Sequence, residues 1–324
     1  MKPFLMLSML VLIGVIVWLF KPVAPVSKPP PVSLDEPVQE SVSVQEAVKE
    51  SAPVQKPVQK IEVPQYEIPH AVRYRFTLKN TKNRLLKQAE FWTYAPVKQT
   101  ATQKVMRITA SHSHEILTDS LGNQVLHFVF SNIPPYTSKV ITVTTELMLA
   151  KEVNTFEEKS QQWFLGEEAF VEISHPKIQA MAKRLKKKTE LSTSRQIFNW
   201  VAGHIQYAGY IRENRGALYA LTERRGDCTE YMYLFTALAR VNEIPARGMG
   251  GYISSENGLL KSDEYHNWAE FYWEGKWFLA DPQNKVFMDK QSNYIAMRII
   301  SEQSNLAQSH RFWYLGEGLS VRMN

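Results

Sequence analysis

The spacing of hydrophobic and polar residues changes several times along the 324-residue chain. An uninterrupted apolar run extends from Phe4 to Phe20, and a polar, proline-rich stretch follows it. Segments that alternate with period two then predict strands up to about residue 150, and apolar residues at helical spacing predict helices from about residue 176. Alternating segments return after about residue 264. This order of strands, helices and further strands predicts an α+β fold.

The first apolar run predicts a membrane-spanning helix. It ends at Lys21 and Pro22, and at about 1.5 Å per residue it is just long enough to cross the hydrocarbon core of a bilayer. A cleaved signal peptide is the alternative interpretation. No small-x-small cleavage site precedes the prolines, so we expect an uncleaved anchor over residues 1–21. The flanking lysines do not decide the orientation, but the very short leading segment favours a periplasmic or extracytoplasmic position for the rest of the chain.

Residues 22–70 predict a tether without a core of its own. Pro-Val pairs recur here, with Glu, Gln, Ser and Lys between them, and proline removes backbone donors. Such a composition is typical of a semi-extended, polyproline-like linker. A ligand for a proline-binding partner is the alternative.

Residues 71–155 are expected to form a β-sandwich of immunoglobulin-like type. Segments rich in β-branched and aromatic residues alternate with period two, and turn signals separate them. The predicted strands are 74–78, 89–94, 105–108, 125–130 and 140–144.

Helical spacing dominates the next part. One helix is expected after Pro176 and a second from Ser194. A third follows Cys228, because Tyr231, Leu234, Phe235 and Leu238 have the i, i+3, i+4, i+7 spacing of a buried amphipathic helix. Residues 264–273 and 276–281 then read as two strands of a hairpin whose turn is Glu274-Gly275.

Cys228 is the only cysteine in the chain, and it lies where the third helix begins. The free N–H groups and the positive end of the helix dipole favour a thiolate at that position. A lone cysteine is more often a small buried hydrophobe. The hairpin changes this interpretation, because it brings His266 beside Asp281. A Cys nucleophile, a His base and an Asp that orients the His are the groups that acyl transfer through a thioester requires.

These residues lie in motifs that resemble the transglutaminase-like superfamily of papain-type cysteine enzymes. The resemblance covers roughly residues 174–284, and the order and spacing of the motifs make it specific. Asn267 departs from the pattern, since a small residue is commoner there. The motifs in chain order are Gly226-x-Cys228-x-Glu230, Glu243-Ile244-Pro245-Ala246-Arg247, His266-Asn267-Trp268, Gly275-Lys276-Trp277 and Asp281-Pro282.

The resemblance implies a membrane-anchored, bacterial-type member of the family. Its fold would be a papain-like transglutaminase core, placed in residues 156–324, preceded by the β-sandwich. Cys228 would be the nucleophile, His266 the base and Asp281 the orienting acid. Tyr207 resembles the aromatic residue that helps to hold the oxyanion, and Trp268 is expected to pack beside the thiol and exclude water.

The resulting hypothesis is a cysteine-dependent acyl-transfer enzyme that acts on amide bonds of proteins or peptides, with peptidase-like or amidase-like hydrolysis favoured. Transglutaminase-type cross-linking or amidation is the alternative, and so is a non-catalytic binding or structural module on the same fold. The net charge of +6 comes without a basic array interleaved with aromatic residues, so no nucleic-acid partner is expected. The chain has no glycine-rich phosphate loop and no acidic calcium loop, so we expect no cofactor and no metal.

Overall fold

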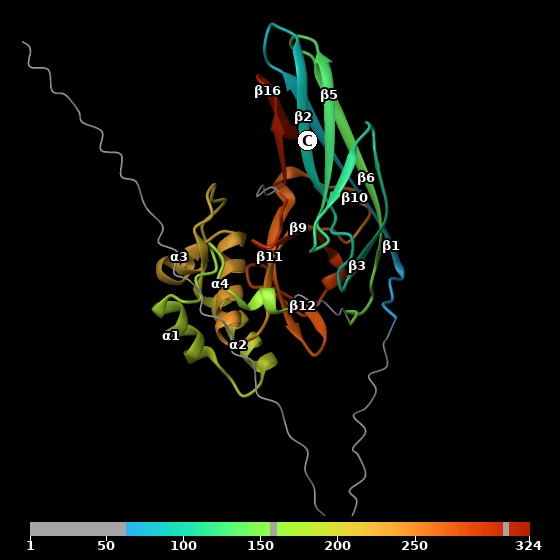
Figure 1. Ribbon diagram of the computed structural model, residues 1–324. Coiled ribbons are helices and arrows are strands. Elements are labelled where there is room, and N and C mark those ends of the chain that lie inside the picture. Colours follow the sequence, from blue (N-terminus) through green and yellow to red (C-terminus); the bar gives the residue numbers. More distant parts are fainter. Residues whose placement is uncertain (1–62, 156–160, 307–310) are drawn as a thin grey trace, which may run out of the picture. The chain divides into compact units, whose positions relative to one another are not determined.

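The computed structural model describes residues 63–155, 161–306 and 311–324 (Figure 1). The expected anchor and the linker up to residue 62 therefore lie outside the described residues. Within the described ranges, no helix is long and apolar enough to cross a membrane.

The strands are β1 (Ile68–Asn80), β2 (Leu86–Ala95), β3 (Gln103–Ala110), β4 (Glu115–Thr118), β5 (Gln124–Ile133), β6 (Ser138–Leu149), β7 (Gln206–Tyr207), β8 (Arg225–Gly226), β9 (Ala246–Ile253), β10 (Gly258–Leu259), β11 (Tyr265–Trp273), β12 (Lys276–Asp281), β13 (Val286–Phe287), β14 (Tyr294–Ile300), β15 (Phe312–Leu315) and β16 (Leu319–Met323). The helices are α1 (Pro176–Leu185), α2 (Glu190–His204), α3 (Gly216–Glu223) and α4 (Cys228–Val241), with 3-10 turns η1 (Gln161–Leu165), η2 (Ser262–Glu264) and η3 (Gln291–Asn293). The predicted α+β class is confirmed.

The N-terminal strands form two sheets that share one core. The first has the order β10-β1-β6-β3, and the second has the order β15-β2-β5-β4. Alternate residues of each sheet point inward, so that Phe76 and Ile141 of the first sheet meet Phe91 and Phe128 of the second. All of the predicted strands are present, and each extends beyond its predicted segment.

The two C-terminal strands belong to these same sheets. β15 pairs with β2, and β16 pairs with β1. Without them β1 and β2 would present unpaired N–H and C=O groups along most of one side. The segment 156–324 thus supplies a strand to each of the two sheets, and the domain boundary after residue 155 stays a prediction.

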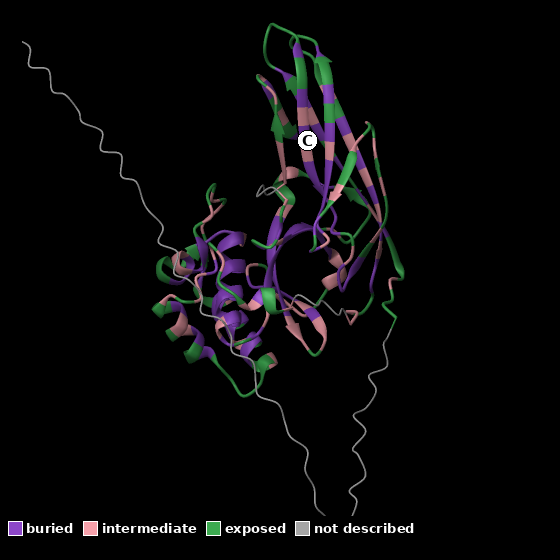
Figure 2. Ribbon diagram, in the orientation of Figure 1, coloured by how far each residue is buried: buried purple, intermediate pink, exposed green. Residues whose placement is uncertain are grey.

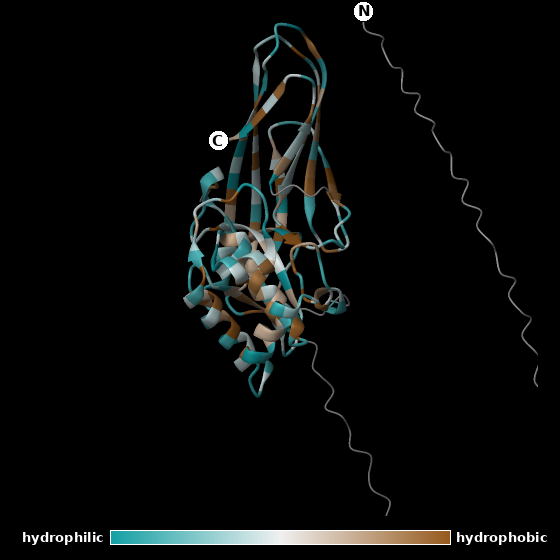
Figure 3. Ribbon diagram, turned by 90° about the vertical axis from the view of Figure 1, so that its left-hand side faces the viewer, coloured by the Kyte–Doolittle hydropathy of each residue, from teal (hydrophilic) through white to brown (hydrophobic). Residues whose placement is uncertain are grey.

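The other major sheet has the order β13-β12-β11-β9-β14 and is antiparallel throughout. Helix α4 packs on one of its faces, where the Phe235 ring contacts Phe271 of β11, and the other helices surround α4. Figure 2 shows α4 almost entirely buried, and Figure 3 shows hydrophobic and hydrophilic residues on the same helices, as expected for helices with one buried face. The opposite face of the sheet contacts the sandwich, where Ile295 and Met297 join its core. In Figure 1 this sheet accordingly lies between the helices and strands β1 to β6.

The predicted hairpin is β11 and β12. Trp273 pairs with Lys276, so Glu274 and Gly275 form a two-residue loop with positive φ values of 46° and 81°. Positive φ at both positions is the mark of a type I′ turn, whose twist matches that of the strands it joins. This turn fixes the register that carries Asp281 back toward the start of β11.

Candidate active site

Helix α4 begins at Cys228 because the residues around it cap the helix. The Asp227 carboxylate accepts the Thr229 N–H at 2.8 Å, and the Glu230 carboxylate accepts the Asp227 N–H at 3.0 Å. These reciprocal bonds are a capping box. The N–H of Cys228 has no acceptor among the described residues, as expected for a first helical residue. It is therefore available to a ligand.

The segment that leads into α4 requires glycine at position 226. A Cβ there would lie 2.3 Å from the Cβ of Glu230, closer than real side chains come. Gly226 pairs with Tyr207 in the short β7/β8 ladder, so the glycine also sets the distance between Tyr207 and the start of α4.

His266 and Asp281 form a buried pair. His266 Nε2 lies 2.7 Å from Asp281 Oδ2, and the two residues are 8% and 1% exposed. Burial acts to lower the pKa of His266, but hydrogen bonds with Asp281 and Cys228 outweigh it and raise that pKa to about 9. The structure thus brings together all three residues that the sequence predicted as a triad, and it favours a protonated imidazole near neutral pH.

Two further side chains hold Asp281, and no sequence pattern pointed to either of them. The Tyr294 hydroxyl donates to Asp281 Oδ2 at 2.9 Å, and the Asn284 amide donates to the same oxygen at 2.8 Å. Burial acts to raise the pKa of Asp281, but the hydrogen bond and charge of His266, together with these donors, lower it overall. The carboxylate is therefore kept ionised beside the imidazole.

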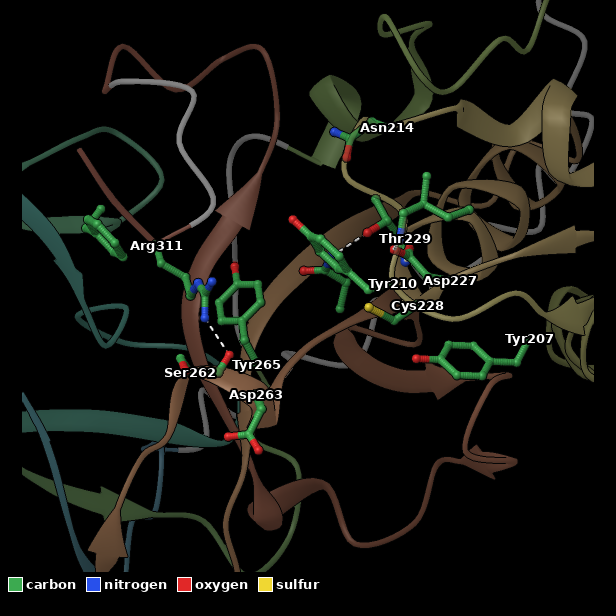
Figure 4. Close-up of a pocket in the computed structure, with 13 residues that line it drawn as sticks. Tyr207, Tyr210, Asn214, Asp227, Cys228, Thr229, Ser262, Asp263, Tyr265 and Arg311 are labelled. Atoms are coloured by element: carbon green, nitrogen blue, oxygen red, sulfur yellow. Dashed lines mark hydrogen bonds between the residues drawn. The ribbon is translucent and has the colours of Figure 1, made fainter. Parts of the chain in front are cut away.

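Cys228 lies on a pocket of about 570 Å³. Tyr207, Tyr210 and Thr229 line it near the cysteine, and Figure 4 shows the Tyr207 phenol directed toward that region. Tyr207 and Tyr210 are 60% and 82% exposed, so the cysteine side of the pocket is open to water.

Trp268 does not line this pocket. It is 1% exposed, and its ring stacks on the His266 imidazole with centroids 6.4 Å apart. Its other ring contact is an edge contact with Tyr294 at 5.1 Å. Trp268 thus lies against the His266 and Asp281 pair and shields it from water.

Asn267 joins the strand of His266 to the first turn of α4. Its amide donates to the Thr229 hydroxyl at 2.9 Å, and the residue is buried. The departure from the family pattern at this position thus has a structural use, because it holds β11 against the residue that follows Cys228.

The capping carboxylates also hold the segment 209–215 beside the pocket. Asp227 accepts the Ile211 N–H at 2.8 Å, and Glu230 accepts the Arg215 N–H at 2.9 Å. Burial raises the pKa of Glu230 to about 7, although its two backbone hydrogen bonds act in the opposite direction. The expectation that no metal is needed stays a prediction; among the described residues, no three His, Cys, Asp or Glu side chains are grouped as a metal site.

Residues 179–282, a range that contains Cys228, His266 and Asp281, match the family model described as Transglutaminase-like superfamily. Among solved structures, a candidate cysteine protease from Cytophaga hutchinsonii has the same fold, with a TM-score of 0.53 and 16% identity over 79% of this chain and 92% of that chain. The periplasmic domain of TgpA from Pseudomonas aeruginosa gives a TM-score of 0.36 and 14% identity over 63% of this chain and 89% of that chain. No curated protein matches the sequence.

Proposed function

Because the chain contains a transglutaminase-like domain, we propose that this protein is a cysteine-dependent acyl-transfer enzyme that acts on amide bonds of proteins or peptides. One observation carries the proposal. The buried His266, held at 2.7 Å by Asp281, lies near enough to Cys228 at the start of α4 that the cysteine helps to raise the pKa of the imidazole. A nucleophile, a base and an orienting acid close to one another are what the first step of such a reaction needs.

In the first step the Cys228 thiolate attacks the amide carbonyl and forms a C–S bond. The oxyanion that results is held by the free N–H of Cys228, and we assign Tyr207 as a second donor. The C–N bond then breaks as the His266 imidazolium gives its proton to the leaving nitrogen. In the second step neutral His266 takes a proton from water or an amine, which attacks the thioester and releases Cys228.

Water is the favoured acceptor in the second step. The exposed aromatic residues Tyr207 and Tyr210 leave the cysteine side of the pocket open, so water can reach the thioester. We therefore propose hydrolysis of a peptidase-like or amidase-like kind. The apolar run from Phe4 to Phe20 supports attachment to a membrane, with the enzyme on its extracytoplasmic side.

The first test is the rate of Cys228 alkylation by iodoacetamide between pH 5 and pH 10, measured on the purified chain by mass spectrometry. The wild-type protein should react at least about tenfold faster at pH 6 than His266→Ala, which should react as a free thiol does, mainly above about pH 8. His204→Ala is the matched control, because His204 hydrogen-bonds only a carbonyl of its own helix. If the profiles of the wild-type protein and His266→Ala coincide, the ion-paired nucleophile does not exist and a binding module is the better interpretation.

A second measurement decides between the two acceptors. A peptide mixture is incubated with the protein in the presence of a fluorescent primary amine. Hydrolysis predicts new carboxyl termini or Glu residues without fluorescence in the peptides. Incorporation of the amine would show transglutaminase-type chemistry, and Cys228→Ser is the blank for both readings.

A further inference from the structure

We propose that Arg311 binds a carboxylate group of the substrate, on the side of the pocket away from Cys228. The proposal rests on the acyl-transfer function above and adds the substrate class, an acidic acyl substrate. In Figure 4, Arg311, Ser262, Asp263 and Tyr265 lie together on one side of the pocket, while the residues near Cys228 lie on the other. A molecule that fills the pocket would contact both sides.

The Arg311 backbone is fixed by the sandwich. Its carbonyl oxygen accepts the Tyr94 N–H at 3.0 Å, and the next residue, Phe312, pairs with Thr93. The sandwich thus contributes a wall of the pocket through β15. This gives the sandwich a role in substrate recognition.

The Arg311 side chain is also held in place, but its charge is not compensated. Its guanidinium donates to the Ser262 carbonyl oxygen, hydrogen-bonds Tyr252 and lies 5.7 Å from the centre of the Tyr265 ring. A guanidinium has five N–H donors, so donors remain for a ligand. Among the residues that the structure describes, no carboxylate lies within ion-pair distance of Arg311.

Other arginines of the chain show the contrast. Buried Arg240 pairs with Glu168 at 2.9 Å, and buried Arg247 pairs with Glu270 at the same distance. Even exposed Arg107 has a partner, Glu146. Arg311 is half-buried in a pocket and has no such partner among the described residues, which is the arrangement expected of a cation whose counter-charge arrives with the substrate.

The acidic residues of the pocket do not take this role. Asp227 is occupied by the N–H groups of Thr229 and Ile211. Asp263 is exposed and lies beyond ion-pair distance of Arg311. A carboxylate fits the remaining donors best, because the planar guanidinium binds it through two parallel hydrogen bonds. The carboxylate can be the terminus of a peptide or the side chain of Glu or Asp.

The test uses thiol-reactive probes rather than a substrate. Chloroacetyl-glycine, chloroacetyl-diglycine and chloroacetyl-triglycine are each compared with their C-terminal amides, since every glycine adds at most about 3.6 Å of reach. Chloroacetyl-Gly-Glu-amide and chloroacetyl-Gly-Gln-amide report the side-chain alternative. At one length of the glycine series, or in the comparison of the Glu probe with the Gln probe, the probe that carries a carboxylate should alkylate Cys228 faster than the matched amide. The ratio of the two rates should be at least about ten. Arg311→Gln should bring that ratio close to one.

Arg107→Gln is the matched control, because it removes the same charge from the exposed face of the sandwich. The proposal is overturned if no acid probe is favoured, or if both variants change the ratio equally. A measurement without any variant supports it independently: acetyl-diglycine should protect wild-type Cys228 from chloroacetamide better than its amide does, and equal protection at every length would contradict the proposal. A chloroacetyl probe reacts with any accessible thiol, so these ratios can be read even if the His266→Ala test shows that the chain is not an acyl-transfer enzyme.

Discussion

The charge of one imidazole decides how the candidate site responds to pH. The pKa of His266 is about 9 in the folded protein, against an ordinary value of 6.5, so protonation of this residue stabilises the fold. That contribution is complete below about pH 6.5 and is lost as the pH rises through 9. The pKa of Asp281 is lowered, so its contribution is complete above its ordinary value of 3.8 and is lost only as the pH falls below it. Both contributions to stability are therefore complete between about pH 3.8 and pH 6.5.

We predict that the free energy of unfolding falls by up to about 3 kcal/mol between pH 6.5 and pH 9.5 because of His266. Urea denaturation of the wild-type protein and of His266→Ala at several pH values measures this. The variant should lack most of the fall, whatever its stability at pH 6.5. An equal fall in both proteins would assign the pH dependence to other groups.

The partner of His266 has a separate and measurable effect. Asp281→Asn removes the negative charge that lies 2.7 Å from the imidazole, so the pKa of His266 should drop well below 9, and burial should then lower it further. An NMR titration of the His266 ring gives the value directly. Asp263→Asn is the control, because Asp263 lines the pocket and is not among the groups that shift His266. An unchanged His266 titration in Asp281→Asn would mean that the pair is not coupled.

At this scale the sequence predicted the residues that stand at the ends of recognisable elements. Cys228 starts a helix, His266 lies at the entrance of a strand, and Asp281 ends the next one. Tyr294 and Arg311 could not be predicted in the same way. Tyr294 reaches the site through the pairing of its strand β14 with β9, and Arg311 reaches it through the pairing of the following strand, β15, with β2; no local pattern encodes those pairings.

At the scale of elements, the capping box of α4 does more than begin a helix. Glu230 accepts two backbone N–H groups, from Asp227 and from Arg215 in the segment beside the pocket. We predict that Glu230→Ala destabilises the protein by about 2–4 kcal/mol, because both donors lose their partner and the Asp227 N–H is buried. Glu230→Gln should cost less, since its amide oxygen can still accept a hydrogen bond.

Thermal or urea unfolding measures the difference between the two Glu230 variants. The pKa of Glu230 is raised to about 7 from 4.5, so ionisation of this residue weakens the fold as the pH rises from about 4.5 to above 7. Glu230→Gln should remove that part of the pH dependence. If the Ala and Gln variants are equally stable, the backbone hydrogen bonds of Glu230 contribute nothing measurable.

Helix α3 shows where local patterns stop being informative. It spans only Gly216–Glu223, and no sequence pattern predicted it. The Glu172 carboxylate accepts the N–H groups of Ala217 and Leu218 at 3.0 and 3.2 Å. The start of this helix is therefore held by a residue far away in the sequence, in place of a local cap. Helix α4 and the β11/β12 hairpin carry their own caps, stripes and turn, and they could be predicted.

At the scale of the whole described region, the sandwich and the candidate catalytic core share buried residues and paired strands. Ile295 and Met297 of β14 lie in the core of the sandwich, and β15 and β16 complete its sheets. The sequence suggested a boundary after residue 155 because it shows where strand patterns give way to helical ones. It could not show that the last strands return to the first ones, since the register of long-range pairing depends on tertiary packing.

Gln103 allows a test of whether the sandwich and the catalytic core lose stability together, because its buried amide joins β3 of the sandwich to β14 of the core sheet. It donates to the carbonyl oxygens of Val97 and Ala296 at 2.9 Å and accepts the Ala296 N–H at 2.8 Å. We predict that Gln103→Ala lowers stability by about 2–5 kcal/mol, because buried backbone groups lose their partners. Hydrogen exchange of amides in β6 and in α4 should report the same loss, because we expect both to unfold as one cooperative unit. Gln88→Ala, on the exposed face of β2, is the control and should change neither. A loss confined to β6 or to α4 would show instead that the two parts unfold separately.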